Sequence, residues 1–212
     1  MIVRSSHVLP NVIIEASSES DVLKAENALS KIGSRPNGKG ILNQVYNNAR
    51  NGKTLKISVV SGRPNSTYPT LTLSQIVKHK ASPDEKNIEN IIIASSLAQK
   101  RGKGRKGEGT SSIIEWNPNL SVDVDIDGIP FRGFDKNAAF LSLTHELIHG
   151  YRILKGTFLG NDRNERNNPD SLFMREEDRA VGVNKSKSNN LSENGVRKEH
   201  GYPLRSQYLA GR

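Results

Sequence analysis

One five-residue stretch combines residue types and a spacing that could do chemistry. His145 and His149 are four positions apart, and Glu146 directly follows the first of them. On a helix, side chains at i and i+4 share one face, one turn apart, so both imidazoles can bind a single Zn²⁺. Glu146 then lies beside the metal, where it can take a proton from a water and pass it to a leaving amine. The stretch predicts a zinc-dependent hydrolase with one zinc ion per chain.

The helix that must carry this stretch is the most regular one that the sequence predicts. It is expected from about residue 136 to residue 154, with a cap near Asp135 and apolar side chains around the motif. Polar groups are costly to bury in such a setting unless they coordinate or hydrogen-bond something. The alternative is that two histidines flank a helix turn for packing or solubility. The apolar surroundings favour metal binding.

The third metal ligand would define the class of zinc enzyme. The metzincin extension requires Gly at position 152 and His at position 155, where this chain has Arg152 and Lys155. The gluzincin plan instead needs a Glu on a second helix downstream. Glu176 and Glu177 lie on such a predicted helix. Glu177 shares the more apolar face, so it is the expected ligand, with Glu176 behind it or at the surface; an ordinary acidic helix turn is the alternative.

Several stretches of the sequence resemble a known family. They span residues 143–150, 176–182 and 192–205, and residues 106–116 are also similar. Together they resemble the NleD/HopH/XopG family, zinc metalloproteases that bacterial pathogens secrete as type III effectors. In site plan this family is similar to the clostridial neurotoxin light chains. The resemblance covers about residues 90–210.

The resemblance implies a fold, a place of action and a substrate. It implies a gluzincin-type zinc endopeptidase that a type III system delivers into the host cell cytosol, where it cleaves a host signalling protein. The NleD branch cuts stress-activated MAP kinases (the JNK and p38 classes) in their activation loop, so a MAP kinase is the implied substrate. We expect a monomer with no membrane and no specific nucleic acid among its partners.

The resemblance also draws attention to Arg205 and Tyr208. Neurotoxin light chains place an Arg-x-x-Tyr pair near the metal, and this chain has that spacing. Residues three apart lie on one helix face, so a guanidinium and a phenol could converge on one oxyanion. The alternative is a basic C-terminal helix with Arg205 solvated and Tyr208 packed. Tyr202 is the second candidate for a catalytic phenol, although its neighbour Pro203 favours a structural role for it.

Composition excludes several other kinds of protein. The chain has 212 residues, 31 Lys and Arg against 22 Asp and Glu, and no Cys. The lack of Cys excludes a disulfide scaffold, thiol catalysis and thiolate zinc sites. No apolar run is long enough to span a membrane, and the first residues lack the apolar core of a secretory signal. The net charge of +9 fits an acidic partner surface or nucleic acid.

The predicted architecture is α+β, a single zincin-like (gluzincin) metalloprotease domain with a small mixed sheet and a central HExxH helix. We expect an N-terminal arm or short strand over residues 1–16 and the domain over residues 17–212. Helical spacing predicts a helix over residues 18–33 and, after a breaker at residues 35–38, a second helix over residues 41–49; alternation predicts strands over 55–59 and 111–116 and a hairpin over 121–131. Residues 61–87 give no clear pattern beyond a short helix near 73–78, and residues 91–93 fit a strand or a helix.

Residues 100–106 hold five positive charges in seven positions. A solvated turn is the plain interpretation. Our functional hypothesis is that this basic loop docks an acidic protein substrate beside the cleft, because it leads into strand 111–116, which is expected to bind the peptide by β-augmentation. The rival function is a basic nucleic-acid- or protein-binding module without proteolytic activity. Aromatic residues make up only 5% of the chain, which leaves such a module without a stacking platform.

Overall fold

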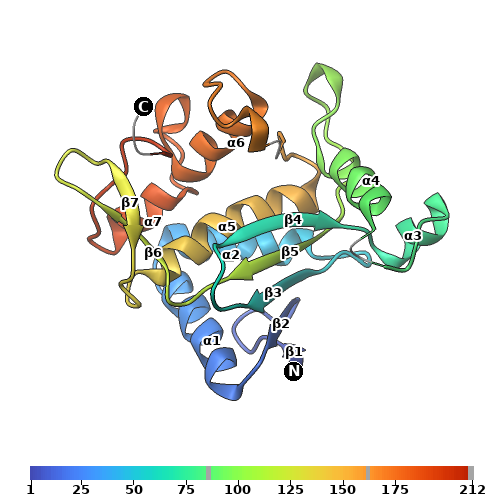
Figure 1. The fold of residues 1–212 in the computed structure, drawn as a ribbon, viewed down its shortest axis with the longest axis horizontal. Helices are drawn as coiled ribbons and strands as arrows, with labels where there is room; N and C mark the ends of the chain where they lie inside the picture. Colours follow the sequence, from blue (N-terminus) through green and yellow to red (C-terminus); the bar gives the residue numbers. More distant parts are fainter. Residues whose placement is uncertain (85–86, 161–162, 210–212) are drawn as a thin grey trace.

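A five-stranded mixed sheet and the helix that packs across it form the centre of the molecule (Figure 1). The computed structural model describes residues 1–84, 87–160 and 163–209. The strands are β1 (Ile2–Ser5), β2 (Val12–Ala16), β3 (Leu55–Val59), β4 (Ser66–Thr70), β5 (Ser111–Trp116), β6 (Ser121–Val124) and β7 (Pro130–Gly133). The α-helices are α1 (Glu19–Gly33), α2 (Pro36–Asn48), α3 (Leu73–His79), α4 (Ile88–Ala98), α5 (Ala139–Lys155), α6 (Leu172–Val181) and α7 (Glu193–Glu199). Short 3-10 helices lie at Gly102–Gly104, Arg163–Glu165 and Asn184–Ser186.

The strand order in the main sheet is β1-β2-β3-β5-β4. β2, β3 and β5 run parallel, while β1 and β4 pair antiparallel at the two edges. β6 and β7 form a separate antiparallel hairpin. These elements confirm the predicted α+β class, the mixed sheet and the hairpin. No helix among the described residues is long and apolar enough to cross a membrane.

The expectation of an arm over residues 1–16 is wrong, and its short-strand alternative is closer. β2 lies inside the main sheet, in parallel register with β3. Val12, Ile14 and Ala16 alternate along it and are buried, because one face of the strand belongs to the core. The sheet therefore crosses the expected boundary at residue 17, and residues 210–212 of the expected domain lie outside the described part.

α1 and α2 connect β2 to β3, as the parallel pairing of these strands requires. Ser18 caps α1 by accepting a hydrogen bond from the backbone N–H of Asp21. Pro36 starts α2 in the first helical turn, where its missing N–H costs nothing. α1 matches its predicted span closely, while α2 begins at Pro36, inside the predicted breaker at residues 35–38.

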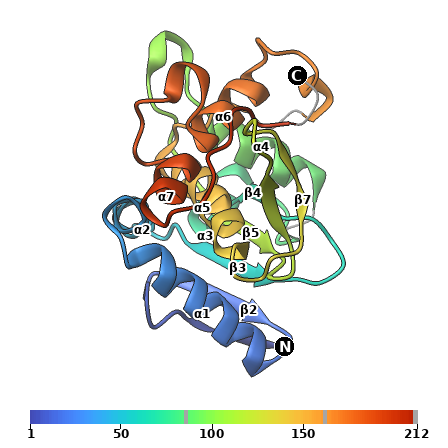
Figure 2. The same ribbon diagram turned by 90° about the vertical axis from the view of Figure 1, so that its left-hand side faces the viewer.

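α5 is the central helix, and nearly every residue from Ala139 to Leu154 is buried. It packs against β4 and β5 and against α2, α6 and α7, which places it in the middle of the molecule in Figure 2. It begins three residues later than the sequence predicts. Asp135 does not cap it; its carboxylate accepts from the backbone N–H of Asn137 in the preceding turn.

The segment without a clear sequence pattern contains the edge strand β4, which pairs with β5. Its sequence, Ser-Thr-Tyr-Pro-Thr, lacks apolar alternation. Pro69 has no backbone N–H, so it fits an edge strand and not an interior one. The expectation that strand 111–116 is the peptide-binding edge is wrong, because β5 lies between β3 and β4.

Two further stretches resolve as helix and as irregular chain. Residues 91–93 belong to α4, whose cap Asn87 accepts hydrogen bonds from Glu89 and Asn90. Among the described residues of the last segment, 192–209, only those of α7 are helical. Gly201, in the left-handed region with φ 74°, and Pro203 end the helical run.

Candidate metal centre

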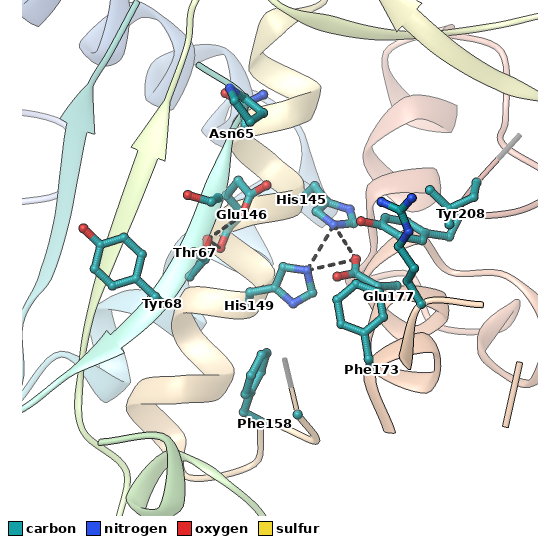
Figure 3. Close-up of a pocket in the computed structure, with 15 residues that line it drawn as sticks. Asn65, Thr67, Tyr68, His145, Glu146, His149, Phe158, Phe173, Glu177 and Tyr208 are labelled. Carbon is teal, nitrogen blue, oxygen red and sulfur yellow. Dashed lines mark hydrogen bonds and ion pairs between the residues drawn. The ribbon is translucent and has the colours of Figure 1, made fainter. Parts of the chain in front are cut away.

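α5 presents both histidines of the HExxH motif on one face. His145 and His149 are 8% and 5% exposed, and their Nε2 atoms lie 3.0 Å apart. Figure 3 shows both rings pointing to one spot. Two unprotonated or two protonated nitrogens at this distance repel each other, so a third group must stabilise the arrangement.

α6 supplies that third group. Glu177 Oε2 lies 3.0 Å from His145 Nε2 and 3.3 Å from His149 Nε2. The potential ligand atoms of all three side chains lie within 4.8 Å of one another. Two imidazole nitrogens and one carboxylate oxygen are the donor set of a catalytic zinc site that leaves a position open for water or substrate. The three residues fit a zinc ion.

The second nitrogen of each histidine has its own carboxylate. His145 Nδ1 lies 3.0 Å from Glu193 Oε2, and His149 Nδ1 lies 3.3 Å from Glu176 Oε1. A carboxylate that accepts a hydrogen bond from Nδ1–H keeps the ring proton on Nδ1, which leaves Nε2 of a neutral ring free as a ligand atom. Such partners orient metal-binding imidazoles and raise their basicity. Each of the two histidines therefore has a carboxylate partner at the nitrogen that faces away from the other ligands.

Arginines surround each of these two outer carboxylates. Glu193 accepts from Arg197 Nε and Arg205 Nη1, both at 2.7 Å. Glu176 accepts from Arg152 Nη1 at 2.8 Å, and Arg179 Nη1 lies 3.5 Å from its other oxygen. The two carboxylates are 1% exposed, so they depend on these cations to stay ionised.

The charges at the site shift one another's protonation. Burial alone would lower the pKa of His149, but Glu177 and Glu176 outweigh it and raise that pKa to about 10. Burial opposes the shift of His145 in the same way, and its hydrogen bonds to Glu177 and Glu193 raise its pKa. The imidazoles hold the pKa of Glu177 well below its usual range, although burial opposes this. In the absence of a metal, the three carboxylates therefore favour protonation of the histidines.

Glu146 lies beside the cluster and does not point into it (Figure 3). Its Oε2 accepts a hydrogen bond of 2.6 Å from the Thr67 hydroxyl on β4. The side chain is 9% exposed and lines the cavity over the metal cluster. It is therefore placed as a proton-transfer group and not as a fourth ligand.

The C-terminal segment brings Tyr208 to the cluster, although not by the predicted route. Arg205 and Tyr208 lie outside any helix, so the argument from a shared helix face is wrong. The Tyr208 ring stacks on His145 with 6.0 Å between ring centroids. The Arg205 guanidinium donates to Glu193 and to the Tyr208 backbone carbonyl, and it also lines the cleft. Tyr202 packs against Phe140 and donates to the Asn137 carbonyl, a structural position.

The cleft over the cluster has two halves that share His145, Glu146 and Tyr208. One half, of about 450 Å³, extends between β4 and α6 and includes Phe158 and Arg166. The other half, of about 550 Å³, extends under the β6–β7 hairpin and is more apolar. Residues on either side of a scissile bond would therefore meet different surroundings.

The free edge of β4 borders the first half of the cleft, where Asn65, Ser66, Thr67 and Tyr68 line it. No described side chain of the basic loop at residues 100–106 lines either half. Its base lies close, because the backbone N–H of Lys100 donates to the carbonyl of Phe158, whose side chain lines the cleft.

Sequence reasoning missed Thr67 and Glu193 as members of the site. Thr67 lies 79 residues before Glu146, and Glu193 lies 48 residues after His145. Neither has a periodic spacing to the motif. Only Glu193 carried any signal, since it falls within the stretch that resembles the protease family.

A family model described as Peptidase_M91, effector protein, matches residues 14–208. The chain belongs to this family. The matched range includes the whole metal cluster and Tyr208, so the site described above is part of a peptidase-family effector protein. No curated protein sequence matches the chain.

Solved structures similar to this one are botulinum neurotoxin light chains. The serotype HA light chain gives a TM-score of 0.51 at 15% identity, over 90% of this chain and 66% of that one. The Clostridium botulinum serotype F light chain gives 0.49 at 11% identity, over 94% and 79%. The type G light chain gives 0.40 at 16% identity, over 68% and 43%. The chain thus spans less than two thirds of the serotype HA light chain and has the same fold.

Proposed function

We propose that this chain is a zinc endopeptidase of the gluzincin type, secreted as an effector to cleave a protein of a host cell. The observation that carries the proposal is the convergence of His145, His149 and Glu177, with Glu146 beside them. Membership of a peptidase effector family supports it. The resemblance described above supports delivery by a type III system into the host cytosol and a MAP kinase as the substrate.

Six residues that line the cleft have proposed roles in catalysis. His145, His149 and Glu177 would hold one zinc ion, which when bound supplies Lewis acidity that activates water and polarises an amide carbonyl. The Glu146 carboxylate takes a proton from the attacking water and gives it to the leaving amine. The Tyr208 phenol stabilises the developing oxyanion, and Arg205 assists by fixing the segment that carries Tyr208.

The substrate backbone would add to the free edge of β4. The β3–β5 hydrogen bonds use the backbone of Ser112 and Trp116, so residues 111, 113 and 115 of β5 face β4. In the β4–β5 register their partners are Thr70, Tyr68 and Ser66. Thr67 and Pro69 therefore turn their backbone groups away from β5, and an extended peptide can pair there.

A Glu146→Gln variant tests the proposal. We expect it to bind one zinc ion like the wild type but to lose about 10²–10⁴-fold in kcat, the usual contribution of a general base. Wild-type protein incubated with host lysate should create new N-termini that a chelator and Glu146→Gln both abolish. Full proteolysis by Glu146→Gln, or a wild type that cuts nothing in the lysate or in purified MAP kinases, would contradict the proposal.

A further inference from the structure

Glu146 has far fewer partners than the other carboxylates of the site. Glu176 and Glu193 each have arginines, and Glu177 has two imidazoles. Within the described residues, the only side chain that hydrogen-bonds the Glu146 carboxylate is Thr67, at 2.6 Å (Figure 3). The orientation of the buried carboxylate therefore depends on one hydroxyl.

The Thr67 hydroxyl is well placed for this task. It lies 3.2 Å from the backbone carbonyl of Glu146 as well as 2.6 Å from the carboxylate, so it contacts both ends of that residue. A hydroxyl carries one proton, and its contact with the carboxylate is the shorter of the two, so the carboxylate is the main acceptor. Because threonine is β-branched, its χ1 angle is stiff and the hydroxyl keeps its direction.

We propose that Thr67 is a positioning residue that holds the general base. Its hydroxyl donates a hydrogen bond to Glu146 Oε2, which leaves Oε1 free to exchange protons with groups at the metal cluster. The inference rests on the proposed function, and it adds a link between substrate and base. Thr67 also turns its backbone N–H and C=O to the free edge of β4, so a substrate strand paired there is held by the residue that orients Glu146.

The test compares Thr67→Val, which keeps the shape and removes the donor, with Thr67→Ser, which keeps the donor. Thr70→Val makes the same change on the same strand and serves as the matched control. We expect Thr67→Val to lower kcat by about 10- to 100-fold, the usual cost of losing such an outer partner, with KM changed less than about 2-fold. Zinc content and melting temperature should match those of the wild type, Thr67→Ser should recover most of kcat, and Thr70→Val should behave as the wild type.

A second measurement does not depend on activity. With ¹³C-labelled glutamate carboxyl groups, the resonance lost in Glu146→Gln identifies Glu146. In zinc-free protein this resonance should move in Thr67→Val and stay near its wild-type position in Thr67→Ser and Thr70→Val.

Three results would overturn the inference. They are an unchanged kcat in Thr67→Val, a Thr67→Ser variant as slow as Thr67→Val, and a loss of kcat that follows a loss of zinc or of folding. If the wild type cleaves nothing, the proposed function fails, while the carboxyl resonance still tests the contact between Thr67 and Glu146.

Discussion

At the residue scale, the three carboxylates of the site contact different nitrogens of the two histidines. Glu177 faces the inner nitrogens of both histidines, while Glu193 and Glu176 each face one outer nitrogen. Arginines hold the outer pair in the ionised form; Arg205 and Arg197 lower the pKa of Glu193 well below its usual range despite burial. The outer pair can thus keep each ring in one orientation whether or not a metal is bound.

Glu193→Gln should weaken zinc binding and the fold together. The glutamine has one acceptor oxygen where the carboxylate has two, so His145 Nδ1 and Arg197 Nε cannot both keep their acceptors, and we expect zinc affinity to fall by about 10- to 100-fold. It also leaves Arg197 and Arg205 buried without their carboxylate, which should cost about 3–5 kcal/mol of unfolding free energy. Chelator competition and denaturant unfolding measure the two effects. Glu89→Gln, on the exposed side of α4, is the control and should change neither.

The zinc-free protein should lose stability as the pH rises. The pKa of His149 is about 10 in the folded protein, against 6.5 for an unperturbed histidine. A raised folded pKa stabilises the fold fully below the unfolded value, and this stability is lost as the pH rises through the folded value. Melting temperatures of zinc-free protein should therefore fall between pH 6.5 and pH 10. The zinc-loaded protein, whose histidines are neutral, should not share this fall; equal pH profiles would contradict the prediction.

The inner part of the site could be predicted because the spacing along two helices fixes it. His145, Glu146 and His149 have helical spacing, and the apolar face of α6 indicated Glu177 over Glu176. The residues that complete the site could not be predicted in this way. Thr67 and Glu193 reach it through tertiary packing, and no local pattern records which strand or helix will pack against α5.

At the scale of elements, the C-terminal segment acts as a strap over the cleft. The Asn194 side chain donates to the carbonyl of Arg205 and accepts from its backbone N–H. Ser206 donates through both its backbone N–H and its hydroxyl to the Gly128 carbonyl in the β6–β7 turn. These contacts position Tyr208 from both sides.

Asn194→Ala should loosen this strap without touching the metal cluster. Loss of both hydrogen bonds frees the backbone of Arg205, so Tyr208 should lose its fixed place over His145. We expect kcat to fall by about 10-fold, since misplacing a catalytic group by about 1 Å can cost up to 10²-fold, with zinc content unchanged. Asn47→Ala, exposed on α2, is the matched control. A variant with wild-type kcat would show that Tyr208 is held by other contacts.

The elements that the sequence predicted share a clear period, and those that it missed do not. α1, α2 and α5 bury apolar residues at helical spacing, and β3 alternates. β4 has polar and proline residues because one edge is free and its side chains meet the cleft. The run Ile91-Ile92-Ile93 is apolar throughout, yet Ile92 is 64% exposed, so its composition could not indicate its place.

At the scale of the whole molecule, the net charge of +9 affects how the protein associates with its partners. The basic loop at residues 100–106 adjoins the cleft through Lys100 and Phe158. Its cations can attract an acidic protein surface over about 10 Å at moderate salt. This effect would act on encounter with the substrate and not on the chemical step.

Charge reversal at Arg105 and Lys106 tests that role. Both residues are exposed, and their change to Glu should lower kcat/KM for an acidic protein substrate by about 10-fold at low salt. The difference should shrink as salt is added. Reversal of Lys24 and Lys39, exposed on α1 and α2, changes the net charge equally and should have less effect. If the two double variants had equal kinetics, the prediction that the loop attracts the substrate would be wrong.

The strand order also governs how the molecule can be built. β4 precedes β5 in the chain, yet β5 is its only neighbour in the sheet. β4 therefore joins the sheet only through its pairing with β5, and contacts between such distant segments form slowly. The rim of the cleft therefore depends on one strand pairing. Until that pairing has formed, the chain lacks the strand that presents the Thr67 hydroxyl to Glu146.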